Sequence, residues 1–368
     1  MISYIRMTKH FYLFYLIVVV ILCDHTRTLS QNNRNISLNI HYGFIISHHP
    51  YMEHLTKSHI PSIELNLFKA TYGEKQWEQL YHYPETGISF YSSYLENPSQ
   101  LGYLYGIYPY INFKLNRASK QKIYLRAGMG ISYVTQKFDR ITNYKNIAIG
   151  SHYNGMMALR MNHKIIISKI FQIETGLGLT HFSNGSMVTP NLGINMITAN
   201  IGFTYSAGKE HSIIRDSIPA AIKKWNYTII AGGGATEIDP PGGKPYGAYT
   251  ISANIEKTCN HQLRFVTGID WFYNNANLEK LKRKNVVISG ESENMQIGTK
   301  IGCALTIARL ILPFEMGVYV YTKPNSSGYI YHRVGIRYQI TNHFIANITL
   351  KTHFVKADYV EWGLGYQF

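Results

Sequence analysis

The stretch Ile123-Tyr-Leu-Arg-Ala-Gly-Met-Gly-Ile-Ser-Tyr133 alternates between apolar residues and polar or small ones. Its odd positions are all apolar, whereas its even positions from Arg126 onward are Arg, Gly, Gly and Ser. A period of two over about ten residues predicts a β-strand with one apolar and one polar face. A strand of this length with a continuous apolar face is typical of a barrel that spans a lipid bilayer.

The same alternation recurs along the chain and is also found in its last nine residues. An apolar face is formed by Val360, Trp362, Leu364, Tyr366 and Phe368, and an amphipathic last strand that ends in Phe resembles the carboxy-terminal signature of bacterial outer-membrane barrels. Counting the segments predicts an all-β fold, an antiparallel transmembrane β-barrel of about 16 strands with a range of about 12–16. Further alternating segments lie near residues 36–47, 101–115, 166–183, 195–206, 245–257, 262–274, 329–340 and 343–354.

A long polar segment, residues 208–223, divides the predicted strands into two sets of about eight. Residues 31–207 carry the first set, and residues 208–368 carry the additional strands that end in Phe368. The two sets form either one large barrel or two small ones. We expect one large barrel.

The composition agrees with this fold and narrows the choice of partner. The chain has 30 Tyr, 30 Gly and only 15% charged residues, with a mean hydropathy of −0.14. These values argue against a disordered chain and against a bundle of membrane-spanning helices. The formal net charge of +15 suits either nucleic acid or a phosphate-bearing lipid surface. The barrel pattern favours the lipid surface, so we expect a membrane partner and no nucleic acid.

The first thirty residues predict export from the cytoplasm. Arg6 and Lys9 precede an apolar stretch over residues 11–22, which is short for a membrane span and typical of a signal peptide. We expect residues 1–30 to be removed and the barrel to lie in a bacterial outer membrane. A lipid anchor at Cys23 is the alternative, but the bulky Leu22 before it disfavours that choice.

One pair of segments carries candidate chemistry: His181-Phe-Ser-Asn-Gly-Ser186 and Pro190-Asn-Leu-Gly-Ile-Asn195. In the strand before the first segment, odd positions are apolar and even positions are polar or small. The same holds for the strand that follows the second segment. His181, Ser183 and Asn195 therefore lie at the rim of one hairpin and face the lipid, where polar groups are costly without a partner or a function.

These residue types are the parts of a nucleophilic acyl-transfer site. A serine hydroxyl, a nearby histidine as base and a third group that orients the histidine form such a site. Residues two apart on a strand share a face, so a hydrogen bond between His181 and Ser183 is expected. Backbone amides of Asn184, Gly185 and Ser186 are candidates for an oxyanion hole. The alternative is a rim of polar residues at the point where the strand leaves the bilayer.

The two segments resemble the PagL-type lipid A deacylases, outer-membrane barrels that are also called acyloxyacyl hydrolases. The family motif is His-x-Ser-Asn followed by Asn-x-Gly-x-Glu on the partner strand. The resemblance implies that His181 is the general base and Ser183 the nucleophile, and it places the acidic residue of the family at Asn195, where this chain departs from the motif. It is specific over about residues 165–206, whereas residues 208–368 have no counterpart in the small family members.

The resemblance implies an outer-membrane esterase that removes an ester-linked acyl chain from lipid A or lipopolysaccharide, without a cofactor. The alternative is a non-catalytic barrel, a pore or a structural surface protein, that retains a degenerate hairpin. Histidines 48, 49, 54 and 59 crowd one loop, but their spacing is not diagnostic of a metal site, and we expect none. The pairing of Cys259 with Cys303 and the oligomeric state remain open.

Overall fold

A computed structural model describes residues 34–47, 49–56, 58–95, 97–116, 120–206, 212–288, 290–323, 328–354 and 356–368. The predicted signal peptide, residues 1–30, lies outside these residues. In this part of the chain no helix is both long and apolar enough to cross a membrane. The secondary structure is instead dominated by strands, as the alternation predicts.

Sixteen antiparallel strands lie within the described residues, which confirms the predicted fold class and strand number. The first eight are β1 (Arg34–Ile45), β2 (Ile60–Ala70), β3 (Glu85–Tyr94), β4 (Tyr103–Lys114), β5 (Gln121–Val134), β6 (Tyr153–Ile166), β7 (Phe171–Ser183) and β8 (Ile194–Ser206). The others are β9 (Trp225–Thr236), β10 (Tyr246–Thr258), β11 (Leu263–Asn274), β12 (Met295–Ile307), β13 (Leu310–Thr322), β14 (Ile330–Gln339), β15 (Phe344–His353) and β16 (Lys356–Gln367). Short helices occupy some of the connections: η1 (Pro50–Leu55), α2 (Gln76–Leu80), α3 (Asn275–Arg283) and η2 (Glu291–Asn294).

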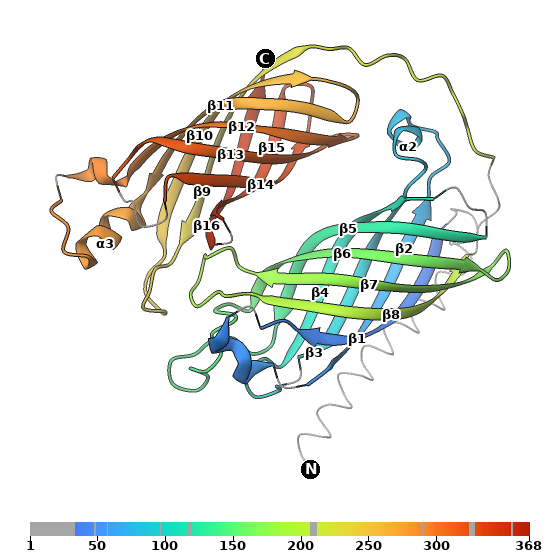
Figure 1. Cartoon of the computed structure of the whole chain (residues 1–368), viewed down its shortest axis with the longest axis horizontal. Coiled ribbons are helices and arrows are strands. Elements are labelled where there is room, and N and C mark those ends of the chain that lie inside the picture. The colour runs from blue at the N-terminus through green and yellow to red at the C-terminus, as the bar shows by residue number, and fades with distance from the viewer. Residues whose placement is uncertain are drawn as a thin grey trace.

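The strands close into two barrels, so the expectation of one large barrel is wrong (Figure 1). In the first barrel β8 returns to β1, with Ile36 opposite Tyr205. In the second barrel β16 returns to β9, with Ile229 opposite Tyr366. Each set of eight is therefore closed by a pairing between its own first and last strands. Hydrophobic period predicts where strands lie, but it does not determine which distant strands pair.

Both interiors are filled by side chains. In the first barrel Glu64 is fully buried and contacts His41, Arg126 and Arg160. In the second barrel the buried carboxylates of Asp270, Glu315 and Glu361 are paired with Lys300, Arg333 and Arg337. Eight strands leave an interior just wide enough for side chains, and paired charges are the form in which ions tolerate burial. Such filled interiors count against the pore interpretation.

An apolar cluster fills the first barrel at the end where β7 finishes, which we call the site end. Phe182 is fully buried in it and packs with Met52, Leu55, Leu104 and Ile149 from other strands and loops. Outward positions of the same strands carry large exposed apolar side chains, as expected for a wall that faces lipid. The site end of the first barrel is therefore closed from within by apolar side chains.

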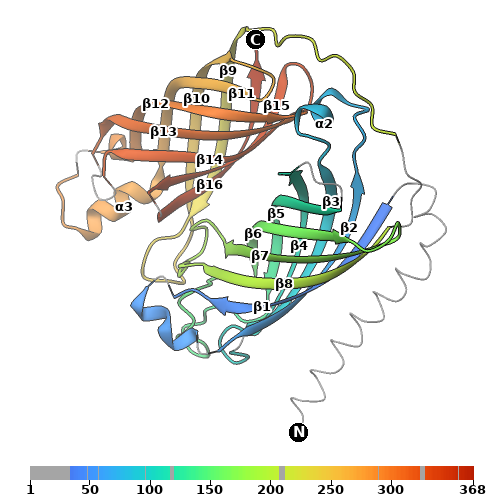
Figure 2. The ribbon, with the colours of Figure 1, turned by 45° about the vertical axis from the view of Figure 1, so that its right-hand side comes forward.

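The two barrels lie side by side (Figure 2), and hydrogen bonds join them at both ends. Away from the site end, the hydroxyl of Tyr81, which follows α2, donates to the carbonyl of Thr306, and the side-chain amide of Gln262 donates to the carbonyl of Leu80. At the site end, the β7–β8 loop contacts the β9–β10 loop. The site end of the first barrel therefore lies beside the end of the second barrel where β9 finishes, and the opposite ends also lie together. Both barrels can then span one membrane in the same orientation.

Candidate active site

The β7–β8 hairpin places the predicted residues on the outer wall of the first barrel. Along β7, even-numbered residues such as Thr180 and Phe182 are buried inside, whereas His181 and Ser183 point outward and are half-buried. The hairpin register sets His181 opposite Asn195 of β8, which also points outward. All three side chains therefore point out of the barrel, the side that the alternation predicts for them.

The three side chains form one hydrogen-bonded line. Nδ1 of His181 lies 2.6 Å from Oδ1 of Asn195, and Nε2 of His181 lies 3.0 Å from Oγ of Ser183. An amide oxygen only accepts, so Nδ1 carries the ring proton and donates it to Asn195. Nε2 is then free of a proton and accepts the hydrogen bond from the Ser183 hydroxyl. This is the arrangement of a serine, its base and an orienting group.

The loop after Ser183 is held by two asparagines. The backbone N–H of Asn184 donates to Oδ1 of Asn191 at 3.0 Å, and the side-chain amide of Asn184 donates to Oγ of Ser151 and to the carbonyl of Val188, each at 2.9 Å. Because the backbone N–H of Asn184 already donates to Asn191, the oxyanion-hole prediction rests chiefly on the backbone N–H groups of Gly185 and Ser186. Sequence reasoning assigned no role to Asn191, although it lies in the second segment, at the first position of the Asn-x-Gly-x-Glu motif.

Gly193 makes room for the imidazole. Its φ of +82° lies in the left-handed region, and a Cβ at this position would lie 3.0 Å from Cε1 of His181. Its backbone N–H donates to the carbonyl of Ala148 at 2.9 Å. Sequence reasoning did not assign Gly193 a role either. The signal was its place two residues before Asn195.

The second barrel holds the loop that follows Ser183. The carbonyl of Ser186 accepts from the backbone N–H of Glu237 at 3.1 Å and from the hydroxyl of Thr236 at 3.2 Å. The hydroxyl of Ser186 donates to the carbonyl of Ala357 at 2.9 Å. The backbone N–H of Thr189 donates to Oε2 of Glu237 at 2.7 Å. We call these contacts the inter-barrel clamp, and Glu237 is buried at its centre.

An apolar contact accompanies the clamp. A Cβ at Gly185 would overlap Cγ2 of Val360 and would lie 3.6 Å from Cδ1 of Leu350, two outward residues of the second barrel. Gly185 also has a φ of +64°. Glycine thus serves two needs here, a left-handed turn and close approach to the neighbouring wall.

The other candidate features stand apart from this site. Among the described residues, no three His, Cys, Asp or Glu side chains gather as metal ligands would. His54 contacts the carbonyl of Lys145, His59 stacks on Tyr42, and His48 lies outside the described residues. Cys259 and Cys303 are both free thiols.

Two family models match the chain, one for each barrel. The model described as lipid A 3-O-deacylase (PagL) matches residues 62–204, a range that includes His181, Ser183 and Asn195. The model described as acyloxyacyl hydrolase, C-terminal domain, matches residues 225–368. A search of curated proteins found no match. The matches divide the chain at the segment that joins the barrels.

Solved structures match the chain with low sequence identity and low TM-scores. Neisserial surface protein A is 9% identical, with a TM-score of 0.33, and the match covers 47% of this chain and 96% of that one. A mutant porin of Rhodopseudomonas blastica is 9% identical, with a TM-score of 0.20, and the match covers 91% of this chain and 100% of that one.

Proposed function

Because the chain belongs to the PagL family of lipid A deacylases and acyloxyacyl hydrolases, we propose that it hydrolyses an ester-linked acyl chain of lipid A in the bacterial outer membrane. The observation that carries this proposal is the hydrogen-bonded line from Asn195 through His181 to Ser183. It lies on the lipid-facing wall, where the acyl chains of a membrane-embedded substrate would be found.

In the proposed reaction Ser183 is the nucleophile. Its Oγ attacks the ester carbonyl carbon, and its proton passes to Nε2 of His181, the general base. The ester oxygen then leaves as an alcohol and takes that proton, and the acyl chain remains on Ser183. A water molecule, deprotonated by His181, attacks the acyl-serine; the acyl carbon–Oγ bond breaks, His181 returns the proton to Oγ of Ser183, and the fatty acid is released. No metal or cofactor takes part in these steps.

The charge that develops on the carbonyl oxygen needs donors close by. Gly185 and Ser186 form a left-handed turn just after the end of β7. We propose that the backbone N–H groups of these two residues form the oxyanion hole. The clamp at Ser186 and Thr189 supports this role because it fixes the same turn from outside.

Asn195 supplies orientation without charge. Its Oδ1 holds the imidazole in the tautomer that leaves Nε2 as the acceptor, but a neutral amide does not stabilise the imidazolium that forms during attack. The amide also favours the second candidate, a structural barrel that has lost activity together with its acid. The filled interiors count against a pore in either case.

The experiment that separates the two candidates is direct. The purified chain is incubated with lipopolysaccharide, and the lipid A species are then weighed by mass spectrometry. Loss of one ester-linked acyl chain with the wild type, and not with Ser183→Ala, supports the hydrolase. Unchanged lipid A after prolonged incubation of a correctly folded barrel supports the structural candidate.

A further inference from the structure

A row of outward side chains crosses the wall of the second barrel at right angles to its strands. The register sets Val360 opposite Leu350, Leu350 opposite Val334 and Val334 opposite Phe314. It then sets Phe314 opposite Cys303 and Cys303 opposite Phe265. We call these residues the apolar row: Val360, Leu350, Val334, Phe314, Cys303 and Phe265.

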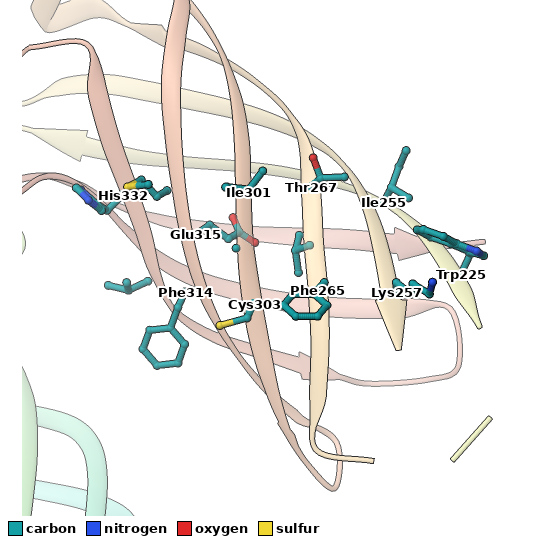
Figure 3. Close-up of a pocket in the computed structure, with 14 residues that line it drawn as sticks. Trp225, Ile255, Lys257, Phe265, Thr267, Ile301, Cys303, Phe314, Glu315 and His332 are labelled. Carbon is teal, nitrogen blue, oxygen red and sulfur yellow. The ribbon is translucent and has the colours of Figure 1, made fainter. Parts of the chain in front are cut away.

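The wall is hollowed along this row. A pocket of about 830 Å³ is lined by four members of the row, with Ile301, Met316 and other outward residues along its second edge. Figure 3 shows Phe314, Cys303 and Phe265 in one line across neighbouring strands. At the far end Lys257 lies 5.0 Å over the ring of Trp225. An elongated apolar hollow of this kind fits a hydrocarbon chain.

The row begins beside the loop that follows Ser183. Its first two members, Val360 and Leu350, are the residues that approach Gly185, and Gly185 follows Ser183 by two positions. Val360, Leu350 and Val334 point outward but are only half-exposed, whereas their outward neighbour Trp362 is 55% exposed. The first barrel therefore covers the beginning of the row, and the row leads away from Ser183 along the second barrel.

The inter-barrel clamp fixes this relation. Ser186 and Thr189 of the first barrel are bonded to Glu237 and Ala357 of the second. These bonds lie on the loop between Ser183 and Asn195, so they tie the second barrel to the loop that follows the nucleophile.

We propose that the apolar row binds the acyl chain whose ester Ser183 attacks, so that the second barrel determines which chain is removed. This inference rests on the proposed function. From Leu350 to Phe265 the row crosses four inter-strand steps, about 19 Å at about 4.8 Å each. That length accommodates an extended fatty acyl chain. The first barrel supplies the chemistry, and the second supplies an apolar binding surface of limited length.

A cross-linking experiment tests the site without turnover. The full chain with Ser183→Ala is placed in phosphatidylethanolamine vesicles with lipid A that carries a diazirine on its ester-linked acyl chain. A phosphatidylcholine with the same diazirine chain is the control probe. We expect the lipid A probe to label the apolar row several-fold more than the control probe does, relative to Ile251, an outward residue that does not line the hollow. Equal labelling by the two probes would mean that bulk lipid fills the hollow and would overturn the inference.

Chain-length preference is the second readout. Val334→Trp narrows the hollow, so we expect kcat/KM for long acyl chains to fall about tenfold relative to that for short ones. Ile251→Trp is the matched control, because Ile251 also points outward but does not line the hollow. An unchanged ratio in Val334→Trp would contradict the inference and leave the hydrolase intact. Selective cross-linking of a wild type that shows no deacylation would contradict the proposed function alone.

Discussion

Oδ1 of Asn195 lies 2.6 Å from Nδ1 of His181, so an amide occupies the place where the family motif has a carboxylate. The amide oxygen accepts the same proton that a carboxylate would accept, and the ring keeps the orientation that Ser183 needs. Only the negative charge is absent. Asn195 can thus orient the His181 ring without placing a negative charge beside it. Substitutions of Asn195 can measure the two effects separately.

The charge is measured by Asn195→Glu. We expect this variant to raise deacylase turnover, because a carboxylate stabilises the imidazolium that forms as Ser183 attacks. Asn195→Leu removes the acceptor and should lower turnover by about tenfold or more. Initial rates of acyl release from lipopolysaccharide report both effects. If neither variant differs from the wild type, residue 195 does not orient the histidine.

The nucleophile and base are tested by Ser183→Ala and His181→Ala. Both should abolish acyl release, since a serine hydroxyl is a weak nucleophile without its base. Both side chains are half-buried on the outer wall, so neither change should affect barrel closure. Faster migration of the unboiled protein on a denaturing gel checks that closure. Wild-type turnover in either variant would eliminate the site.

Gly193→Ala tests the space beside the imidazole. The new Cβ would lie 3.0 Å from Cε1 of His181, so we expect the ring to shift and kcat to fall about tenfold or more. Gly328→Ala is the matched control, because Gly328 has a similar φ of +84° but a Cβ there would meet nothing within 4 Å. Similar losses of kcat in the two variants would assign the effect to backbone strain alone.

The clamp is tested at Glu237. Glu237→Ala removes the acceptor for the Thr189 N–H, so the loop after Ser183 should loosen and kcat should fall by about tenfold with little change in KM. Glu237→Gln keeps an acceptor oxygen and should restore most of the rate. Glu279→Ala, which removes an exposed ion pair to Arg283 on α3, is the control. Equal rates for Glu237→Ala and Glu279→Ala would show that the clamp does not position the site.

The alternation of the sequence predicted the features that depend on near neighbours. A period of two placed the strands and gave His181 and Ser183 their shared outward face, and the hairpin brought Asn195 opposite His181. Closure into two barrels depends on contacts between distant residues, such as Ile36 with Tyr205, which periodicity does not encode. The contact between Glu237 and Ser186 likewise joins two closed barrels. The sequence of neither loop predicts it, because it depends on how the barrels pack together.

The apolar cluster around Phe182 has a consequence for the supply of water. Behind His181, Ser183 and Asn195, the site end of the first barrel is filled by apolar side chains that include Phe182, Met52, Leu55, Leu104 and Ile149, so we expect no water to reach Ser183 through the barrel interior. On the outer wall, which we propose to face lipid, we expect no water either. In the proposed reaction, the water that hydrolyses the acyl-serine would therefore come from the aqueous phase at the rim, past the loop that Glu237 contacts. The rate of acyl-serine hydrolysis should therefore depend on the hydration of this rim, whereas the rate of acyl-serine formation should not.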